Sequence, residues 1–178
     1  MNAIILSALW GVVMMFGGVF FKKSTAPKYW AIAGIIIVLA GNLFEFFGYP
    51  FFNVDTKGML HFDAFGLVFN SVAFICTLIF FLLNGKDFEK IGMHVSEYFC
   101  LLFFVLCGLS ILSSFNSLLL LFLGIEILSI PLYILTGSEK RNLKGNEASL
   151  KYFLMGAFST GLMLMGIALI YGGNSLGS

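Results

Sequence analysis

A run of 21 residues, 116–136, reads NSLLLLFLGIEILSIPLYILT and contains a single charged residue, Glu126, at its centre. At a rise of about 1.5 Å per residue, an α-helix of this length is about 31 Å long, which matches the hydrocarbon core of a bilayer. The run therefore predicts a transmembrane helix. An ionisable group near the bilayer midplane costs at least about 2.5–3.5 kcal/mol on insertion scales, so Glu126 is expected to have a specific role.

Glu126 has polar neighbours on the same face of this predicted helix. Ser129 and Tyr133 follow at i+3 and i+7, and the three side chains form a narrow polar stripe toward one membrane surface. Pro131 lacks an N–H, which favours a local bend or loosening. Two interpretations are open. The stripe is part of a proton path, which we favour for a carboxylate at this depth, or it consists of hydrogen-bonding contacts between helices.

The whole chain has the composition of an integral membrane protein. Hydrophobic residues make up 60% of the 178 residues and charged residues 11%, compared with roughly 45–50% and 25% in soluble domains. Without a long basic run, the sequence does not predict binding to nucleic acid. It has no CxxC pair, and His61 and His94 lie in separate loops. We therefore predict no metal, cofactor-binding or catalytic residues in this chain.

Six apolar segments predict an all-α membrane fold of six transmembrane helices and no soluble domain. The predicted helices cover about residues 2–21, 29–48, 64–83, 97–112, 116–136 and 148–171. Asp63 and Ser96 are placed to cap the third and fourth helices. We divide the chain into residues 1–112, with the first four helices, and residues 113–178, with the last two and the Glu126 region.

Basic residues are concentrated on one side of these helices. The loops after the first, third and fifth helices contain eight Lys and Arg residues, and the opposite side contains Lys57 alone. The eight are Lys22, Lys23, Lys28, Lys86, Lys90, Lys140, Arg141 and Lys144. The positive-inside rule therefore predicts that these loops are cytoplasmic and that both termini lie on the periplasmic side of the inner membrane.

Lys151 is a second charged residue inside a predicted span, about four residues into the sixth helix. Two orientations are open for it: the side chain snorkels to the interface, or it points inward and carries its ammonium toward Glu126. If the two groups approach, they titrate as a coupled pair, because burial disfavours each charge while proximity favours both. Glu45 and Glu97 lie near helix ends, where we expect interfacial positions.

The stretches LLLLFLGIEILSIPLYIL and NEASLKYFLMGAFSTGLMLMGIALIYG closely resemble the subunit N family of respiratory NADH–quinone oxidoreductase, complex I, which belongs to the antiporter-like membrane proteins. The resemblance is dense over these two segments and their connecting loop, about sixty residues. It implies that the chain is the first bundle of an inverted-repeat subunit, whose remaining helices either continue beyond Ser178 in a longer subunit or form a separate polypeptide. It also implies that Glu126 and Lys151 match the family's buried glutamate on the fifth helix and lysine on the sixth.

The function implied by this resemblance is part of a proton-translocation half-channel, coupled to electron transfer from NADH to quinone. Such a chain is a subunit of a translocase without catalytic chemistry of its own. NADH, FMN, iron–sulfur clusters and quinone are expected in partner subunits. Expected partners are other membrane-arm subunits, the remaining helices of the same subunit and lipid. The alternatives are a cation/proton antiporter or membrane-hydrogenase-related subunit, and a purely structural helix bundle that supports assembly.

Overall fold

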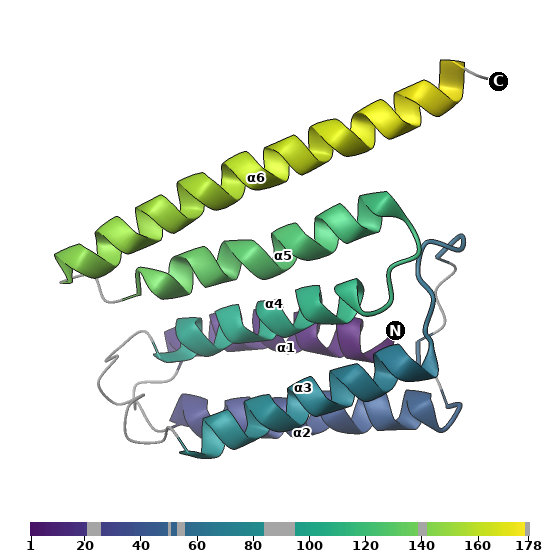
Figure 1. Cartoon of the computed structure of the whole chain (residues 1–178). Helices are drawn as coiled ribbons and strands as arrows, with labels where there is room; N and C mark the ends of the chain where they lie inside the picture. The colour runs from purple at the N-terminus through teal and green to yellow at the C-terminus, as the bar shows by residue number, and fades with distance from the viewer. Residues whose placement is uncertain (21–25, 50, 53–55, 84–94, 139–141, 177–178) are drawn as a thin grey trace.

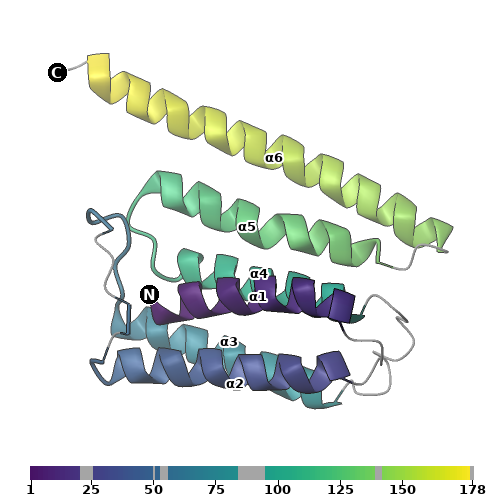
Figure 2. The same cartoon turned by 180° about the vertical axis from the view of Figure 1, so that it is seen from behind.

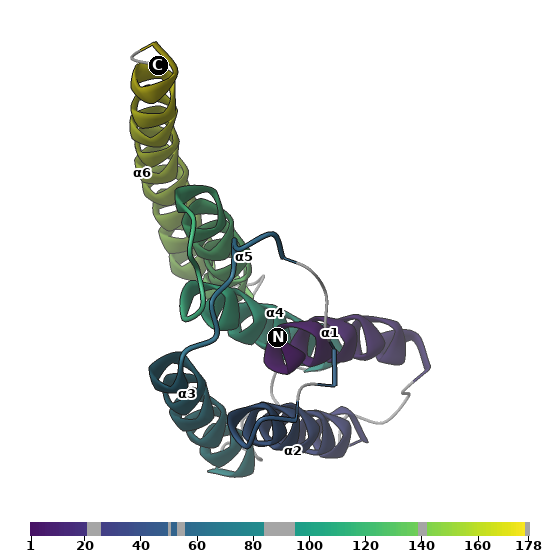
Figure 3. The ribbon, with the colours of Figure 1, turned by 90° about the vertical axis from the view of Figure 1, so that its right-hand side faces the viewer.

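The computed structural model describes residues 1–20, 26–49, 51–52, 56–83, 95–138 and 142–176. Within these residues six helices follow one another along the chain, and each runs antiparallel to the one before it (Figure 1). They are α1 (Asn2–Phe20), α2 (Ala26–Phe46), α3 (Ala64–Leu83), α4 (Val95–Leu112), α5 (Leu118–Thr136) and α6 (Leu143–Leu176). Viewed along the bundle, α1 to α4 are grouped together, and α5 and α6 extend to one side (Figure 3).

Five of these helices, α2 to α6, are long and apolar enough to cross a membrane. The apolar stretch of α1, Asn2–Gly18, is slightly shorter, and α1 lies alongside α4 (Figure 2). Large apolar side chains point outward; Phe65 and Leu83, for example, are 82% and 79% exposed. A surface of this kind is suited to contact with lipid. The prediction of an all-α membrane fold is confirmed.

The observed helix boundaries differ from the predicted ones mainly in α6. This helix has 34 residues and begins at Leu143, five residues before the predicted start. Lys144 and Glu147, which were placed in a basic loop, therefore lie in its first two turns. The helix is about 51 Å long at the standard rise, so it is longer than a bilayer core is thick.

The predicted role of Ser96 as a helix cap is wrong. Ser96 is the second residue of α4, and its hydroxyl donates to the carbonyl oxygen of Met14 on α1 at 2.5 Å. Asp63 does precede α3, and its backbone carbonyl accepts a hydrogen bond from the N–H of Leu67 at 3.1 Å. The carboxylate of Asp63, however, pairs with the ring of His61 at 2.8 Å.

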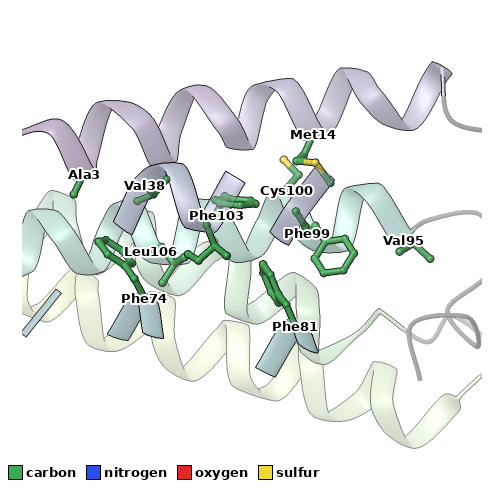
Figure 4. Packing of buried hydrophobic residues seen from close by; sticks show 12 residues of the cluster. Ala3, Met14, Val38, Phe74, Phe81, Val95, Phe99, Cys100, Phe103 and Leu106 are labelled. Carbon is green, nitrogen blue, oxygen red and sulfur yellow. The ribbon is translucent and has the colours of Figure 1, made fainter. Parts of the chain in front are cut away.

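The buried core lies among α1 to α4 and is built around phenylalanine rings (Figure 4). Phe74 and Phe81 on α3 and Phe99 and Phe103 on α4 have no exposed surface. The rings of Phe81 and Phe99 meet edge to face, with centroids 5.0 Å apart at 76°. This geometry is favourable because the positive edge of one ring meets the negative face of the other.

A glycine allows α4 and α5 to approach closely. A Cβ atom placed on Gly108 of α4 would lie 2.6 Å from the backbone nitrogen of Leu128 on α5. Backbone contact of this kind is available only to small residues, and it is a common way to pack helices in membranes. The position of α5, and with it of Glu126, therefore depends on Gly108.

The connection between α2 and α3 is held against the connection between α4 and α5. The N–H of His61 donates to the carbonyl of Ser114 at 2.8 Å, and the N–H of Asn116 donates to the carbonyl of Met59 at 2.8 Å. The side-chain amide of Asn116 adds a bond to the carbonyl of Gly58 at 2.8 Å. These bonds fix the start of α5 relative to α3.

We expect Gly108→Ala to lower the stability of the subunit by about 1–3 kcal/mol, because backbone atoms cannot move aside to admit the new methyl group. Gly18→Ala is the matched control, since the nearest atom to its new Cβ would be Ser96 Cβ at 3.4 Å. Thermal unfolding of the detergent-solubilised subunit should show a lower Tm for Gly108→Ala alone. Equal Tm losses in the two variants would contradict the close α4–α5 contact.

Candidate functional site

Two faces of α5 make different contacts. Gly124 and Leu128 face α4: a Cβ on Gly124 would lie 2.9 Å from the side chain of Leu112, and Leu128 lies against Gly108. Tyr133 is 7% exposed and packs on α6. Residues seven apart on a helix are separated by only about 20° around its axis. Glu126 therefore shares the Tyr133 face, and it is partly buried.

Tyr133 is the central residue of the contact between α5 and α6. Its ring meets the rings of Tyr152 and Phe153 edge to face, with centroids 4.8 and 5.7 Å away. Its hydroxyl lies directly over Gly156, where a Cβ atom would overlap it. The hydroxyl of Ser149 donates to the backbone carbonyl of Tyr133 at 2.7 Å. Tyr133 thus has a packing role in addition to its predicted place in the polar stripe.

Ser129 is hydrogen-bonded within its own helix. Its hydroxyl donates to the carbonyl of Ile125 at 2.5 Å, which leaves the lone pairs of its oxygen free to accept. α5 continues through the buried Pro131 to Thr136. Because proline has no N–H, the carbonyl of Ile127 loses its usual helical donor. The hydroxyl oxygen of Ser129 is therefore an available acceptor between the carboxyl group of Glu126 and Tyr133 on this side of α5.

Lys151 does not meet Glu126 in this structure. Its ammonium pairs with Glu147, one turn earlier on α6, at 2.5 Å, and the two side chains are 70% and 64% exposed. Ser149 and Gly156 mark the α6 face that contacts α5, and Lys151 lies about 200° around the helix from Ser149. Because α6 begins at Leu143, Lys151 is also about 12 Å from the start of the helix, twice the depth predicted from the sequence.

Glu45 is more deeply enclosed than an interfacial residue would be. Its side chain is 8% exposed and pairs with the amino group of Met1, and its carboxylate accepts from the N–H of Asn2 at 2.8 Å. A carboxylate in this position is favoured by the free N–H groups and the dipole at the start of α1. Burial lowers the pKa of the Met1 amino group, and Glu45 opposes that shift. The local sequence contains no signal for this contact, which joins residues more than forty positions apart.

The described residues contain no group of three or more His, Cys, Asp or Glu side chains that could hold a metal ion. All three cysteines are free; Cys100 and Cys107 are buried, and Cys76 is exposed. The groups on the Glu126 face of α5 can accept, hold and release protons and can form hydrogen bonds.

Known proteins share this arrangement. Residues 115–177 match the family model described as the transmembrane region of NADH:quinone oxidoreductase and Mrp antiporters. NADH-quinone oxidoreductase subunit N from Cytophaga hutchinsonii is 40% identical over 174 residues, which are 97% of this chain and 37% of that protein. The protein of the same name from Flavobacterium psychrophilum is 36% identical over 173 residues, with the same coverage of both.

A solved structure has the same fold. A chain in the structure of respiratory complex I from Thermus thermophilus superposes with a TM-score of 0.74 at 30% sequence identity, over 96% of this chain and 36% of that one. The helices and the sequence matches together define an antiporter-like membrane protein. Within that class, the chain is similar to NADH-quinone oxidoreductase subunit N, with 36–40% identity to three curated relatives of that name. It spans little more than a third of the length of the curated relatives it matches.

We expect Gly156→Ala to destabilise the α5–α6 contact by about 1–3 kcal/mol, because its methyl group needs the space that the Tyr133 hydroxyl occupies. Tyr133→Leu vacates that space, although it also loses the aromatic contacts. The double variant should therefore be more stable than the sum of the two single effects predicts, by at least about 0.5 kcal/mol. Unfolding of the four proteins in detergent measures this coupling, and strictly additive losses would show that the two residues do not touch.

Proposed function

We propose that this chain is part of the membrane arm of NADH-quinone oxidoreductase and contributes to a proton-translocation half-channel coupled to electron transfer from NADH to quinone. The observation that carries the proposal is Glu126, the one charged residue of α5, eight residues after Leu118 and ten before Thr136. The family model includes Mrp antiporters as well. The curated relatives named above are subunits of NADH-quinone oxidoreductase, and they favour that enzyme.

The chemistry follows from where the carboxyl group of Glu126 lies. Low-dielectric surroundings favour the neutral form of a carboxyl group, whereas a nearby cation favours the charged form. We propose that movement of a cation toward and away from this carboxyl group drives its proton exchange. Ser129 and Tyr133 line the route from Glu126 toward the end of α5, where their oxygen atoms accept hydrogen bonds from water or from a hydrated proton.

Lys151 takes part in this proposal without direct contact to Glu126. It lies on the α6 face opposite α5, beside Met155 and Phe158, which are 74% and 70% exposed. The remaining helices of a longer subunit would cover this face. Once it is covered, the exposed pair of Lys151 and Glu147 becomes an enclosed pair, in which each charge depends strongly on the other. A proton that arrives at Glu126 then changes the electrostatic energy of the Lys151–Glu147 pair.

The proposed orientation puts the end of the bundle with Lys28 and Lys144 in the cytoplasm. Among the described residues, these two lie at one end, and Lys57 lies in the connection at the other end. The other six basic residues counted for the positive-inside rule lie outside the described residues. We place the chain in the inner membrane with both termini on the periplasmic side. Lipid, other membrane-arm subunits and the remaining helices of the subunit are its proposed neighbours.

The proposal places NADH, FMN, the iron–sulfur clusters and quinone in partner subunits. This chain contributes proton handling and helix packing. It is therefore a subunit of a translocase, and we expect the isolated chain, residues 1–178, to show neither NADH oxidation nor driven proton flux in proteoliposomes.

The orientation is tested with single cysteines in a variant that lacks the three native ones. Lys28→Cys and Lys144→Cys should react with a membrane-impermeant maleimide from the cytoplasmic side, and Lys57→Cys should react from the periplasmic side. The physical basis is the retention of basic loops in the cytoplasm. Labelling of Lys28→Cys and Lys57→Cys from the same side of the membrane would contradict the proposed topology.

The role of Glu126 is tested by Glu126→Gln in the complete subunit within the assembled complex. The change keeps the size of the side chain and removes the titratable charge. Assembly should therefore be normal, while proton pumping per quinone reduced should fall by at least about tenfold, in line with the loss of a proton-transfer group. Glu97→Gln, the same change in the first turn of α4, is the matched control and should pump at the parental rate. Parental pumping by Glu126→Gln would make Glu126 a structural residue.

A further inference from the structure

The interface between α2 and α3 contains a polar cluster that is separate from the Glu126 region. Asn42 of α2 is completely buried, and Asn70 of α3 is 3% exposed. The side-chain nitrogen of Asn42 donates to the carbonyl of Leu67 and to the hydroxyl oxygen of Ser71, both at 2.8 Å. Ser71 in turn donates its hydroxyl hydrogen to the carbonyl of Leu67 at 2.9 Å.

These bonds determine which way the amide of Asn42 faces. The backbone carbonyl of Leu67 can only accept, so the atom of Asn42 beside it has to be the nitrogen. The hydroxyl hydrogen of Ser71 is already directed at Leu67, so its oxygen accepts the second hydrogen of that nitrogen. Both N–H groups of Asn42 are therefore used. Its amide oxygen, Oδ1, points away from this group of bonds.

The amide oxygens of Asn42 and Asn70 are both buried and have no hydrogen-bond donor among the described residues. Asn70 lies between Leu67 and Ser71 in sequence, so it belongs to the same turn of α3 that Asn42 contacts. Backbone N–H groups inside a helix are already bonded to carbonyls one turn earlier. Helices α2 and α3 therefore have no spare backbone donor at this level, and the residues that the structure describes do not supply the missing donors.

A pair of unsatisfied amide oxygens is strongly unfavourable in a membrane-embedded interface, where bulk water cannot reach them. A metal cation is a poor occupant, because the cluster consists of neutral amides and a hydroxyl. The closest acidic residue along α2, Glu45, is already bonded to Met1 and Asn2. Water fits the chemistry better, because it can donate to an amide oxygen while its own oxygen accepts from a side-chain amide N–H.

We propose that ordered water donates to the buried amide oxygens of Asn42 on α2 and Asn70 on α3, which forms a polar region in this chain distinct from Glu126. Asn42 is four residues from the end of α2, and Asn70 is six residues from the start of α3. Both are thus about 6–9 Å below the end of the bundle that contains Lys57. Water enters from that end. The site adds bound water at the Lys57 end of the bundle, whereas the polar stripe of α5 runs from Glu126 toward the opposite end.

The test uses the complete complex in lipid nanodiscs and compares infrared spectra of the parent, Asn70→Leu and Asn146→Leu proteins. Leucine has the same number and branching of side-chain heavy atoms as asparagine and no acceptor, and Asn146 is an exposed control in the first turn of α6. The parent-minus-Asn70→Leu difference spectrum should contain an O–H stretching band that shifts when H₂¹⁸O replaces water. The Asn146→Leu difference spectrum should lack it. If Asn70→Leu assembles with an unchanged or higher Tm and no isotope-sensitive band is lost, the site is dry and the proposal is wrong.

A second measurement covers the case in which Asn70→Leu does not assemble. Solid-state NMR on the parent complex with ¹⁵N-labelled asparagine detects magnetisation that passes from water to side-chain amides. Ordered water predicts transfer to the Asn70 amide at short mixing times, as fast as to exposed Asn146. Transfer to Asn146 without transfer to Asn70 would overturn the proposal.

Discussion

The structure depends on one constraint: polar groups inside a bilayer core have to be satisfied by the protein itself. Helices satisfy their own backbones, and several of the hydroxyl groups within them bond to the preceding turn. Thr77 donates to Ala73, and Ser110 donates to Leu106, each at 2.9 Å. A few polar groups are not satisfied by a hydrogen bond within their own helix. Glu126 and the amide oxygens of the α2–α3 interface are the places where function is expected.

Close packing determines which of these groups can meet. Gly108 brings the backbone of α5 against α4, and Gly156 admits the ring of Tyr133 from α5 into the surface of α6. Together they set the rotation of α5 and α6 about their axes. As a result Glu126 lies on the side of α5 that faces α6, whereas Lys151 lies on the side of α6 that faces away. The coupling that we propose between the two charges therefore has to act at a distance or through groups that cover Lys151.

Much of this could be predicted from sequence, since the hydrocarbon thickness dictates the length of each apolar run. The bounds of α3 were predicted to the residue, and the helical stripe of Glu126, Ser129 and Tyr133 follows from spacing alone. Long-range contacts could not be predicted. Whether Lys151 faces α5 depends on how Gly156 and Tyr133 pack, and the burial of Glu45 depends on the start of α1 more than forty residues away. The capping role given to Ser96 failed because a serine near a helix start can equally donate to a neighbouring helix.

The central claim is that Glu126 changes its protonation state while the complex works. Infrared difference spectroscopy of the assembled complex, before and after NADH reduces the quinone pool, measures this directly through the carbonyl stretch of protonated carboxylic acids. The account predicts a carboxyl band that changes on reduction in the parent complex and is missing from the same difference spectrum of Glu126→Gln. Identical carboxyl bands in the two spectra would show that Glu126 keeps one protonation state throughout turnover, and would contradict the account.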